Sequence, residues 1–510
     1  MTLWTIAGIV LVLLLIVGVG LLSGRKVHDA KDFVSGGGKA GPIVVCGTIM
    51  GSLVSSQATI GTAQLAFHYG IAAWWFTLGS SIGCLVLGIG YARSLRRSGC
   101  LTEISIISKA YDPAAGSLSS VLCSLGIFIS VLAQVVACTG LVTTLFPQVS
   151  FPLAATVSVV FMCVYVLFGG AWGAGIGGVV KLVLLYLASV VGMIFVLVRC
   201  GGASGLVQAL NDSLCATPLG LIQSAANGLS DLPQTASLTA RFGNLIARGP
   251  MKDLGSGLSL LLGVLSTQTY AQAIWSAKTD RDARKGALLS AVLIPPLGIA
   301  GISIGLFMRS HYVLQAEVDA LAAAGQAIPD LPVLASTIQV FPAFVLNHLP
   351  ALIGGIVLGT LLITSVGGGA GLSLGMATIL VKDILKRVSC RFRDEKKELT
   401  ATRLVLGGIL LAAAVVAVAV PGSTINDLGF LSMGLRGSVV LVPMSCALWV
   451  KAPMDRRCVL LSVIVSPLVM LAGKLLALPF DSLYLGVGVS VLCCILAYFF
   501  GKRSGKAAAV

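Results

Sequence analysis

The sequence predicts an all-α polytopic membrane protein with about 13 transmembrane helices. Hydrophobic residues make up 57% of the 510 residues and charged residues 10%, and the mean hydropathy is +1.00. A soluble globule needs about 25% charged residues to cover its surface. Apolar stretches long enough to cross a hydrocarbon core of about 30 Å recur along the chain. The net charge of +15 comes from short loops rather than one soluble face, so we expect no nucleic-acid partner.

Residues 3–22 form the first apolar stretch. Its positive charges, Arg25 and Lys26, follow it, whereas a signal peptide carries its charges before a shorter apolar core. We therefore expect residues 1–23 to remain as an extra N-terminal transmembrane helix. The other predicted spans are 42–67, 72–92, 116–145, 151–169, 175–198, 256–277, 286–307, 346–373, 402–420, 427–450, 458–474 and 482–500.

The charges of the loops predict the orientation of these spans. Loops on one side hold 26 Lys and Arg residues and loops on the other side hold six. The positive-inside rule then places the N-terminus outside and the C-terminus in the cytoplasm. We expect a multi-pass protein of the cytoplasmic (inner) membrane, with the lipid bilayer as a partner and an oligomeric state that the sequence leaves open.

The stretch 41–70 is long enough to cross a bilayer, but a polar interruption lies within it. Ser55, Ser56, Gln57 and Thr59 stand where a lipid-facing helix would be apolar. Backbone that leaves the helix in hydrocarbon loses hydrogen bonds worth several kcal/mol, so breaks occur only where protein or water surrounds them. We interpret the stretch as a broken membrane helix that builds a binding site.

Other spans also carry polar or glycine-rich segments. Three consecutive glycines, 367–369, interrupt the helical character of span 346–373, although tight helix packing explains such glycines equally well. Uncharged side chains in the remaining spans suit the orientation of a polar solute, and hydrogen bonds between helices are the alternative for each. These residues are Gln134, Thr267, Gln268, Tyr270 and Gln272.

Arg436 lies close to the middle of span 427–450. An arginine there costs about 2.5–3.5 kcal/mol unless it faces a cavity or a partner. Its guanidinium suits a carboxylate on a solute, and the alternative is an arginine tied to helix carbonyls or to Asp427. No phosphate-binding loop, metal-spaced His/Cys set or nucleophile motif occurs, so we expect neither an enzyme nor a metal or organic cofactor. Whether Cys200 and Cys215 form a disulfide stays open.

Several short motifs, in order along the chain, resemble the sodium:solute symporter family, whose members transport sugars, amino acids, carboxylates and vitamins. The matching segments are DFVSGGGKAG (32–41), Ile60-Gly61 with Tyr69-Gly70-Ile71, LTEISIISKAYDP (101–113), Phe168-Gly169-Gly170, 272–278 with Ala283-Arg284-Lys285, and Lys382-Asp383-Ile384. Each motif is weak alone, and the resemblance covers most of residues 1–450.

The resemblance implies a leucine-transporter-like fold of two inverted five-helix repeats, each with a broken first helix. The expected divisions are 1–23 for the extra helix, 41–198 for the first repeat, 199–255 for an extracellular loop, 256–450 for the second repeat, and 458–510 for two further helices and a short tail. The solute and the ion are then expected beside the breaks, near the midplane.

Mapping the family's sodium site onto this chain reveals departures. Its backbone ligands map to Gly51 and Val54, but its two hydroxyl ligands map to Gly367 and Gly368. In the family, a carboxylate on the fifth core helix supports the sodium site. Its position maps to Gly178 here, and Lys181 stands one helical turn further along. A register shift of three residues would instead bring Thr364 and Ser365 into the hydroxyl positions.

We therefore predict a secondary active transporter of a small polar organic solute, such as a carboxylate or an amino acid, that works by alternating access. The ammonium of Lys181 would replace sodium, and because burial penalises its charge it could exchange a proton and couple transport to H⁺. Snorkelling of Lys181 to the interface is the structural alternative. Two further functions stay open: a Na⁺-coupled symporter with a shifted ion site, and a non-transporting solute sensor with the same fold.

Overall fold

The computed structural model describes the chain apart from residues 1, 25–37, 39, 101, 216–241, 326, 386–394, 420–423, 451, 477, 479 and 508–510. It confirms the all-α class, because nearly all described residues are helical and the strands form a single two-residue parallel pair. Nine stretches of the described chain are long and apolar enough to cross a membrane. The count of thirteen spans stays a prediction.

The helices follow one another in the order of the chain. In the first half of the chain they are α1 (Leu3–Gly24), α3 (Pro42–Leu53), the π-helical turn η2 (Gln57–Gly61), α4 (Thr62–Tyr69), the 3₁₀ turn η3 (Gly70–Trp74), α5 (Trp75–Val86), the π-helical turn η4 (Leu87–Tyr91), α6 (Ala92–Arg97), α7 (Glu103–Ala110), α8 (Pro113–Leu145), α9 (Phe151–Cys200) and α10 (Ala203–Cys215).

The second half adds the two strands and the remaining helices. Its elements are α13 (Pro250–Leu265), α14 (Gln268–Ser276), α15 (Asp280–His311), β1 (Val313–Leu314), α16 (Gln315–Ala323), β2 (Val333–Leu334), the 3₁₀ turn η5 (Thr337–Gln339), α17 (Val340–His348), α18 (Ala351–Ile379), the π-helical segment η6 (Leu380–Leu385), α20 (Glu395–Ala419), α21 (Ile425–Trp449), α22 (Arg456–Leu475) and α23 (Leu483–Ala507).

Both predicted first helices of the repeats are broken. The first stops at Leu53 and resumes as a π-helical turn at Gln57. The second stops at Leu265, passes through the extended residue Thr267, and resumes at Gln268. The start of α3 is joined to the end of α14, because Ala40 N–H donates to the Ser276 carbonyl at 3.0 Å and the Ala40 carbonyl accepts from Lys278 N–H at 2.9 Å. Backbone hydrogen bonds therefore tie the two broken helices together at one end.

The glycine-rich segment 367–369 does not interrupt its helix, and this expectation was wrong. Helix α18 runs without a break from Ala351 to Ile379. Its glycines lie against neighbours instead: a β-carbon at Gly369 would lie 2.6 Å from the sulfur of Met162. Close packing against other helices holds the segment helical, which is the alternative that the sequence left open.

The predicted spans 151–169 and 175–198 belong to a single helical element, α9, whose side chains at 166–177 are outside the described residues. Its two described limbs, Phe151–Tyr165 and Gly178–Cys200, are both strongly apolar. The motif 168–170 and the side chains of Lys382, Asp383 and Cys215 also lie outside the described residues.

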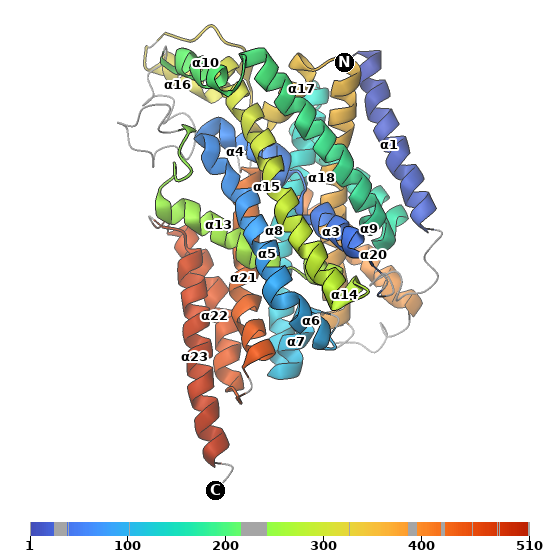
Figure 1. The fold of residues 1–510 in the computed structure, drawn as a ribbon, viewed down its shortest axis with the longest axis vertical. Helices are drawn as coiled ribbons and strands as arrows, with labels where there is room; N and C mark the ends of the chain where they lie inside the picture. Colours follow the sequence, from blue (N-terminus) through green and yellow to red (C-terminus); the bar gives the residue numbers. More distant parts are fainter. Residues whose placement is uncertain are drawn as a thin grey trace.

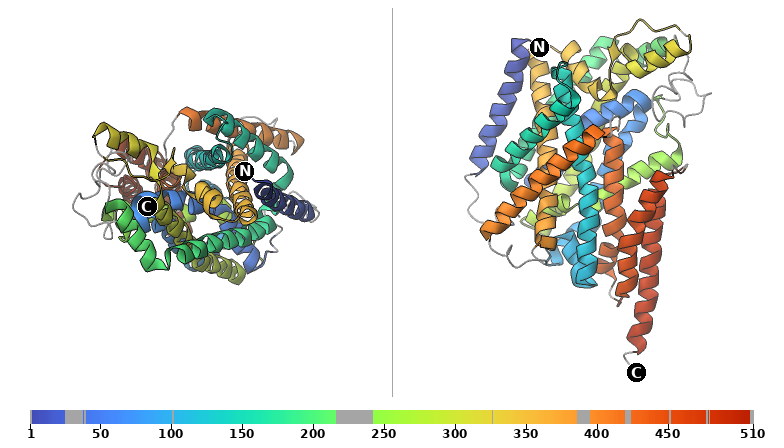
Figure 2. Two further views of the ribbon diagram at one scale, coloured as in Figure 1. Left: turned by 90° about the horizontal axis from the view of Figure 1, so that it is seen from above. Right: turned by 180° about the vertical axis from the view of Figure 1, so that it is seen from behind.

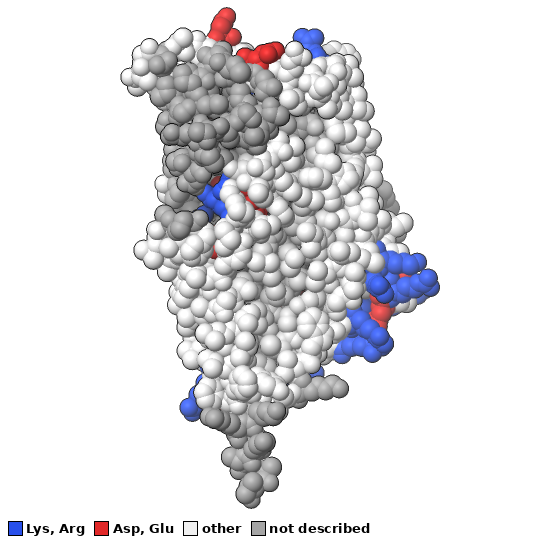
Figure 3. All heavy atoms as spheres, turned by 60° about the vertical axis from the view of Figure 1, so that its left-hand side comes forward, with Lys and Arg blue, Asp and Glu red and all other residues white. Residues whose placement is uncertain are grey.

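The two termini lie at opposite ends of an elongated bundle (Figure 1). Helix α1 runs along one flank, and α22 and α23 pair along another, with the broken helices between them (Figures 1 and 2). On the face in Figure 3, charged side chains stand at the top, at the right edge from mid-height downward and in a small group at the left, and the broad surface between these groups carries no charge. This distribution is typical of a protein that crosses a hydrocarbon layer. Which end faces the cytoplasm stays a prediction.

The extra helix α1 packs closely on α18 through glycines. A β-carbon at Gly8 would lie 2.6 Å from the Leu352 carbonyl oxygen, and one at Gly355 would overlap the Thr5 carbonyl oxygen. Small residues of this kind let membrane helices approach until their backbones touch. The glycines therefore fix the position of α1 on the bundle.

We expect Gly355→Ala to destabilise the protein by about 1–3 kcal/mol, because the new methyl group overpacks the contact between α1 and α18. Gly371→Ala on the same helix is the matched control, since no atom lies within 4 Å of its β-carbon position. Thermal unfolding of the two purified variants compares them directly. Equal melting temperatures would show that α1 is not held by this contact.

Candidate functional site

The break in the first core helix carries a buried polar cluster. Ser55 and Ser56 lie in the non-helical segment between α3 and η2, and Gln134 reaches them from the middle of α8. The amide nitrogen of Gln134 donates to the Ser55 hydroxyl at 2.9 Å, and the Ser56 hydroxyl donates to the amide oxygen of Gln134. All three side chains are buried. The sequence-predicted residues Ser55, Ser56 and Gln134 therefore meet in one place.

Helix α18 reaches this cluster through Gly368. A β-carbon there would lie 3.1 Å from Oε1 of Gln134 and 3.2 Å from Cβ of Ser55. At Gly367 the nearest atom to a β-carbon would be the phenol oxygen of Tyr165, at 3.5 Å. Gly368 thus faces the break and Gly367 faces Tyr165, and neither of these positions, to which the resemblance assigns sodium-binding hydroxyls, has a side-chain oxygen of its own.

Lys181 reaches the end of α3. Its Nζ donates to the carbonyl oxygen of Gly51 at 2.7 Å, and the residue is only 7% exposed. The two helices lie close together here, since a β-carbon at Gly178 would be 2.7 Å from the Gly47 carbonyl oxygen. The last carbonyls of a helix have no partner within it. The ammonium therefore satisfies a carbonyl that the break leaves open.

The neighbouring carbonyls of α3 find backbone partners. Val54 N–H donates to the Met50 carbonyl at 2.7 Å, and Ser55 N–H donates to the Leu53 carbonyl at 3.0 Å. Because Ser55 N–H turns to Leu53, it does not cap Gly51. A side-chain donor is needed at Gly51, and Lys181 supplies it.

The hydroxyls of Thr364 and Ser365 bond to their own helix. Thr364 donates to the Thr360 carbonyl at 2.6 Å and Ser365 donates to the Leu361 carbonyl at 3.0 Å. Both residues are fully buried. This back-bonding is common for hydroxyl residues inside helices and needs no ion.

Gln57 and Thr59 lie on the π-helical turn after the break. The Thr59 hydroxyl makes two long hydrogen bonds, at 3.4 Å to the Ser55 carbonyl and at 3.5 Å to the Ser56 carbonyl. Gln57 is 3% exposed, and its amide nitrogen has no hydrogen-bond partner among the residues that the structure describes. Buried polar groups are nearly always paired, so this free donor points to a partner that is not part of the chain.

Arg436 is completely buried and is held by hydroxyl groups. Its guanidinium donates to Thr267 at 2.8 Å, to Ser432 at 3.0 Å and to Ser130 at 3.2 Å, and Nε donates to the Ser432 carbonyl at 3.2 Å. The sequence analysis named helix carbonyls and Asp427 as structural partners of Arg436, and of these two the structure contains the contact with a helix carbonyl. Asp427 lies elsewhere, 3.7 Å from Arg248.

Two further predicted residues belong to this second region. Gln268 accepts a hydrogen bond from Glu103 N–H at 3.1 Å, whereas Gln272 is only partly buried. Glu103, on the short helix α7, is 3% exposed and interacts electrostatically with Arg436. Burial raises the pKa of the Glu103 carboxyl well above its usual range, and the positive charge of Arg436 opposes that shift. The hydrogen bonds of Arg436 do not reach the cluster at the break.

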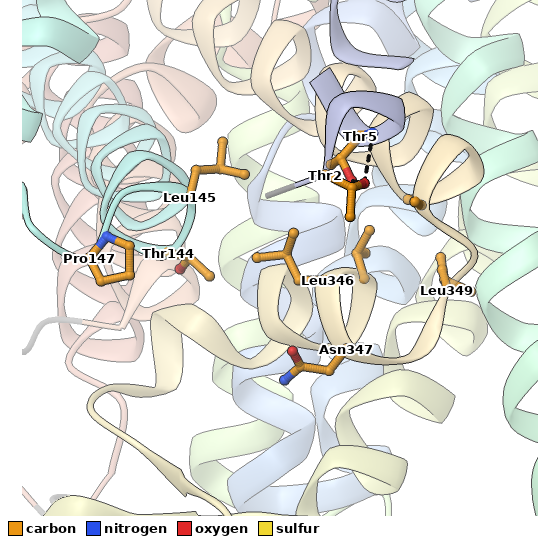
Figure 4. Close-up of a pocket in the computed structure, with 11 residues that line it drawn as sticks. Thr2, Thr5, Thr144, Leu145, Pro147, Leu346, Asn347 and Leu349 are labelled. Atoms are coloured by element: carbon orange, nitrogen blue, oxygen red, sulfur yellow. Dashed lines mark hydrogen bonds between the residues drawn. The ribbon is translucent and has the colours of Figure 1, made fainter. Parts of the chain in front are cut away.

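A cavity of about 500 Å³ lies away from both regions, where α1, α8, α17 and α18 meet (Figure 4). It is lined by Thr2, Thr5, Thr144, Leu145, Pro147, Val345, Leu346, Asn347, Leu349, Ala351 and Gly354. None of the residues that the sequence singled out lines it. We therefore do not assign the solute to this cavity.

The structure adds residues that sequence reasoning missed. Ser130 and Ser432 hold Arg436, and Tyr165 lies beside Gly367. Ser130 lies one helical turn before Gln134, so the polar face of α8 was a usable signal. Asn426, a buried amide without a partner, gave no such signal, because an asparagine at the start of a helix is typical of a cap.

With this geometry established, the chain can be compared with known proteins. A model of the sodium:solute symporter family matches residues 33–465. The chain belongs to the sodium:solute symporter family. Family membership confirms the resemblance of the motifs and makes the chain a secondary symporter that is embedded in a membrane and carries a small molecule.

Solved transporters share the fold of this symporter. A substrate-bound, outward-open Na⁺-coupled sialic acid symporter aligns over 98% of both chains with 16% identity and a TM-score of 0.74. A nucleobase-cation-symport-1 transporter with bromovinylhydantoin bound aligns over 91% of this chain and 93% of its own, with 12% identity and a TM-score of 0.52. A mutant manganese transporter of Eremococcus coleocola aligns over 94% and 97%, with 12% identity and a TM-score of 0.51. These similarities confirm the inverted-repeat fold.

If the solute is an anion whose carboxylate pairs with Arg436, Arg436→Gln should weaken its binding at least tenfold, about 1.4 kcal/mol, because the guanidinium fork is lost. Binding of labelled organic acids and amino acids to the purified variant would measure the effect. Arg456→Gln serves as the control, since the Arg456 side chain is 69% exposed. An unchanged affinity in a folded Arg436 variant would remove this residue from the solute site.

Proposed function

We propose that this symporter moves a small polar organic solute without sodium, and that the ammonium of Lys181 takes the place of the ion. The observation that carries the proposal is the hydrogen bond of 2.7 Å from Lys181 to Gly51. Gly51 is one of the two backbone positions to which the resemblance assigns the sodium ion. A cation is therefore already present there.

Electrostatics favour a positive charge at this point. The carboxyl end of a helix carries a partial negative charge, and the open carbonyls at the end of α3 add to it. In a hydrocarbon environment these dipoles are weakly screened. A sodium ion and an ammonium group offset them in the same way, so α3 can pack on its neighbours with either.

The surroundings of Lys181 suit an ammonium better than a metal ion. Sodium binding in the family uses two adjacent hydroxyls, and Gly367 and Gly368 provide none. The contact between Gly178 and the Gly47 carbonyl leaves no room for a carboxylate in place of Gly178. An ammonium needs fewer oxygen ligands than a metal ion because it can donate to single carbonyls.

The alternative of a snorkelling lysine is less well supported. A snorkelling side chain keeps its charged end in water. Lys181 is 7% exposed, and its charged end lies on the Gly51 carbonyl of another helix. These contacts support a role between helices.

Proton coupling follows from the same contact. A neutral amine could still donate to Gly51, but only the protonated lysine offsets the partial negative charge at the end of α3, while burial favours the neutral form. Loss of the proton would therefore loosen the contact between α9 and α3, and its return would restore it. In this proposal the solute binds beside the Ser55–Ser56–Gln134 cluster, and alternating access moves the bundle around that site.

Two other functions remain to be compared with this proposal. A Na⁺-coupled symporter with a shifted ion site would use Thr364 and Ser365, whose hydroxyls bond to their own helix. A solute sensor would bind without transport. Sodium dependence separates the first from the proposal, and uptake into proteoliposomes separates the second.

We expect uptake in proteoliposomes to be equal in sodium and choline buffers and to be lost in Lys181→Met. A screen with labelled amino acids, sugars and organic acids identifies the solute first. Lys474→Met, at an exposed lysine, is the control. Uptake that rises steeply with sodium, or that survives in Lys181→Met and disappears in Thr364→Val, would place the ion site at Thr364 and Ser365 instead.

A further inference from the structure

Two buried amides lack hydrogen-bond partners at the same helix interface. Among the described residues, eight buried side-chain nitrogen or oxygen atoms have no partner, and three of them are Nε2 of Gln57 and both amide atoms of Asn426. Asn426 is fully buried and Gln57 is 3% exposed. Such unmade hydrogen bonds destabilise a protein, so each requires an explanation.

The two amides lie in one seam between α21 and the part of the broken helix that follows the break, which comprises η2 and α4. Opposite Gln57 stands Gly429, where a β-carbon would lie 2.9 Å from the amide nitrogen. Opposite Asn426 stands Gly61, where a β-carbon would overlap the amide oxygen. Gln57 and Gly61 are four residues apart and Asn426 and Gly429 are three apart, so each pair shares a face of its helix. Each helix therefore presents one amide to a glycine of the other.

Aromatic rings and a polar bridge cover this seam. A β-carbon at Gly429 would lie 3.2 Å from the ring of Phe76, which packs on Phe430 with ring centres 5.9 Å apart. The amide of Gln64 accepts from Ile425 N–H at 3.1 Å and donates to the Thr337 hydroxyl at 2.8 Å. The seam is therefore closed in this structure, and a ligand can enter only when α4 and α21 separate.

We propose that Gln57 and Asn426 bind the transported solute when the seam opens, and that they select solutes with an amide edge, in which a C=O acceptor lies beside an N–H donor. This inference rests on the proposed transport function and names the class of solute. Carboxamides, lactams, ureides and similar rings belong to the class.

The hydrogen-bond donors and acceptors of the two amides determine which solutes fit. Asn426 offers one acceptor and one donor group, whichever way its amide is turned. An amide edge pairs with both, and the Gln57 nitrogen can donate to the second lone pair of the solute carbonyl. A carboxylate has no donor and would leave Oδ1 of Asn426 unpaired, and a site built for hydrogen bonds rejects such analogues strongly.

Glycine at positions 61 and 429 supports a ligand-binding role. A larger residue at either position would push the opposing amide out of the seam. Two buried apolar side chains would fill the seam without unpaired atoms, so packing alone does not account for the amides. Residues that lower the stability of the folded protein are typical of functional sites.

Matched solute pairs test the proposal on the purified full-length protein. The pairs are L-glutamine with L-glutamate and nicotinamide with nicotinate, which differ by amide against carboxylate, and uracil and hydantoin represent cyclic amide edges. Solute-dependent shifts of the melting temperature measure binding. We expect at least one amide solute to stabilise the protein and its carboxylate counterpart to bind at least tenfold more weakly. If no solute with an amide edge shifts the melting temperature, the proposal is wrong.

Variants then identify the residues. We expect Asn426→Asp and Gln57→Ala each to weaken the amide solute at least tenfold. A buried aspartate and the cavity left by alanine also lower the melting temperature of the free protein, so the affinities are compared at a temperature where each variant is folded. Gln315→Ala, at an exposed glutamine, is the control. Unchanged affinity in Asn426→Asp and Gln57→Ala, or lower stability with unchanged affinity, would show a structural role only.

These outcomes are separate from those of the lysine proposal. Uptake of a sugar or a carboxylate that needs Lys181 and ignores sodium would keep the transport proposal and overturn the amide edge. If an amide solute binds and needs Asn426, and its uptake depends steeply on sodium, the amide-edge proposal is kept and the lysine proposal is overturned.

Discussion

A helix that ends inside a membrane protein leaves carbonyl groups without partners, and this constraint governs the centre of the structure. Helix α3 ends at Leu53 in the buried interior, where water cannot satisfy its last carbonyls. Two of them bond to backbone N–H groups, and Gly51 bonds to the ammonium of Lys181. One side chain thus supplies both a hydrogen bond and a positive charge at the negative end of the helix.

Glycines let the neighbouring helices pack closely around this break. Gly47 and Gly178 bring α3 and α9 together, Gly368 brings α18 to the Ser55–Gln134 cluster, and Gly61 and Gly429 bring η2 and α21 together. Packing of this closeness resists small deformations, so neighbouring helices must move as units. The backbone contact between Ala40 and the end of α14 joins the two broken helices at one end, and Gln64 joins α4 to α21 on the other side of the break.

The sequence predicted the fold class and a break at the polar interruption that begins at Ser55, because polar residues inside an apolar span can be read directly. It singled out Gln134 as well, but not its hydrogen bonds with Ser55 and Ser56. The resemblance to the family predicted that Lys181 stands on the helix that faces the break. Other features depended on tertiary packing. The helix through Gly367–Gly369 is held by its neighbours, Glu103 is buried although charged loop residues are usually solvated, and Asn426 reads as a helix cap. The partners of Arg436 come from α8, from its own helix α21 and from the extended residue between α13 and α14, which no local pattern relates.

The central claim is that a lysine already fills the place of the sodium ion. The most direct measurement is a titration of the purified protein with sodium chloride and with choline chloride at matched ionic strength, followed by the melting temperature. A ligand that binds the folded state raises the free energy of unfolding with its concentration. The account predicts that the two titrations coincide. A saturable rise in melting temperature with sodium alone would contradict it, because the ion would then have a site of its own.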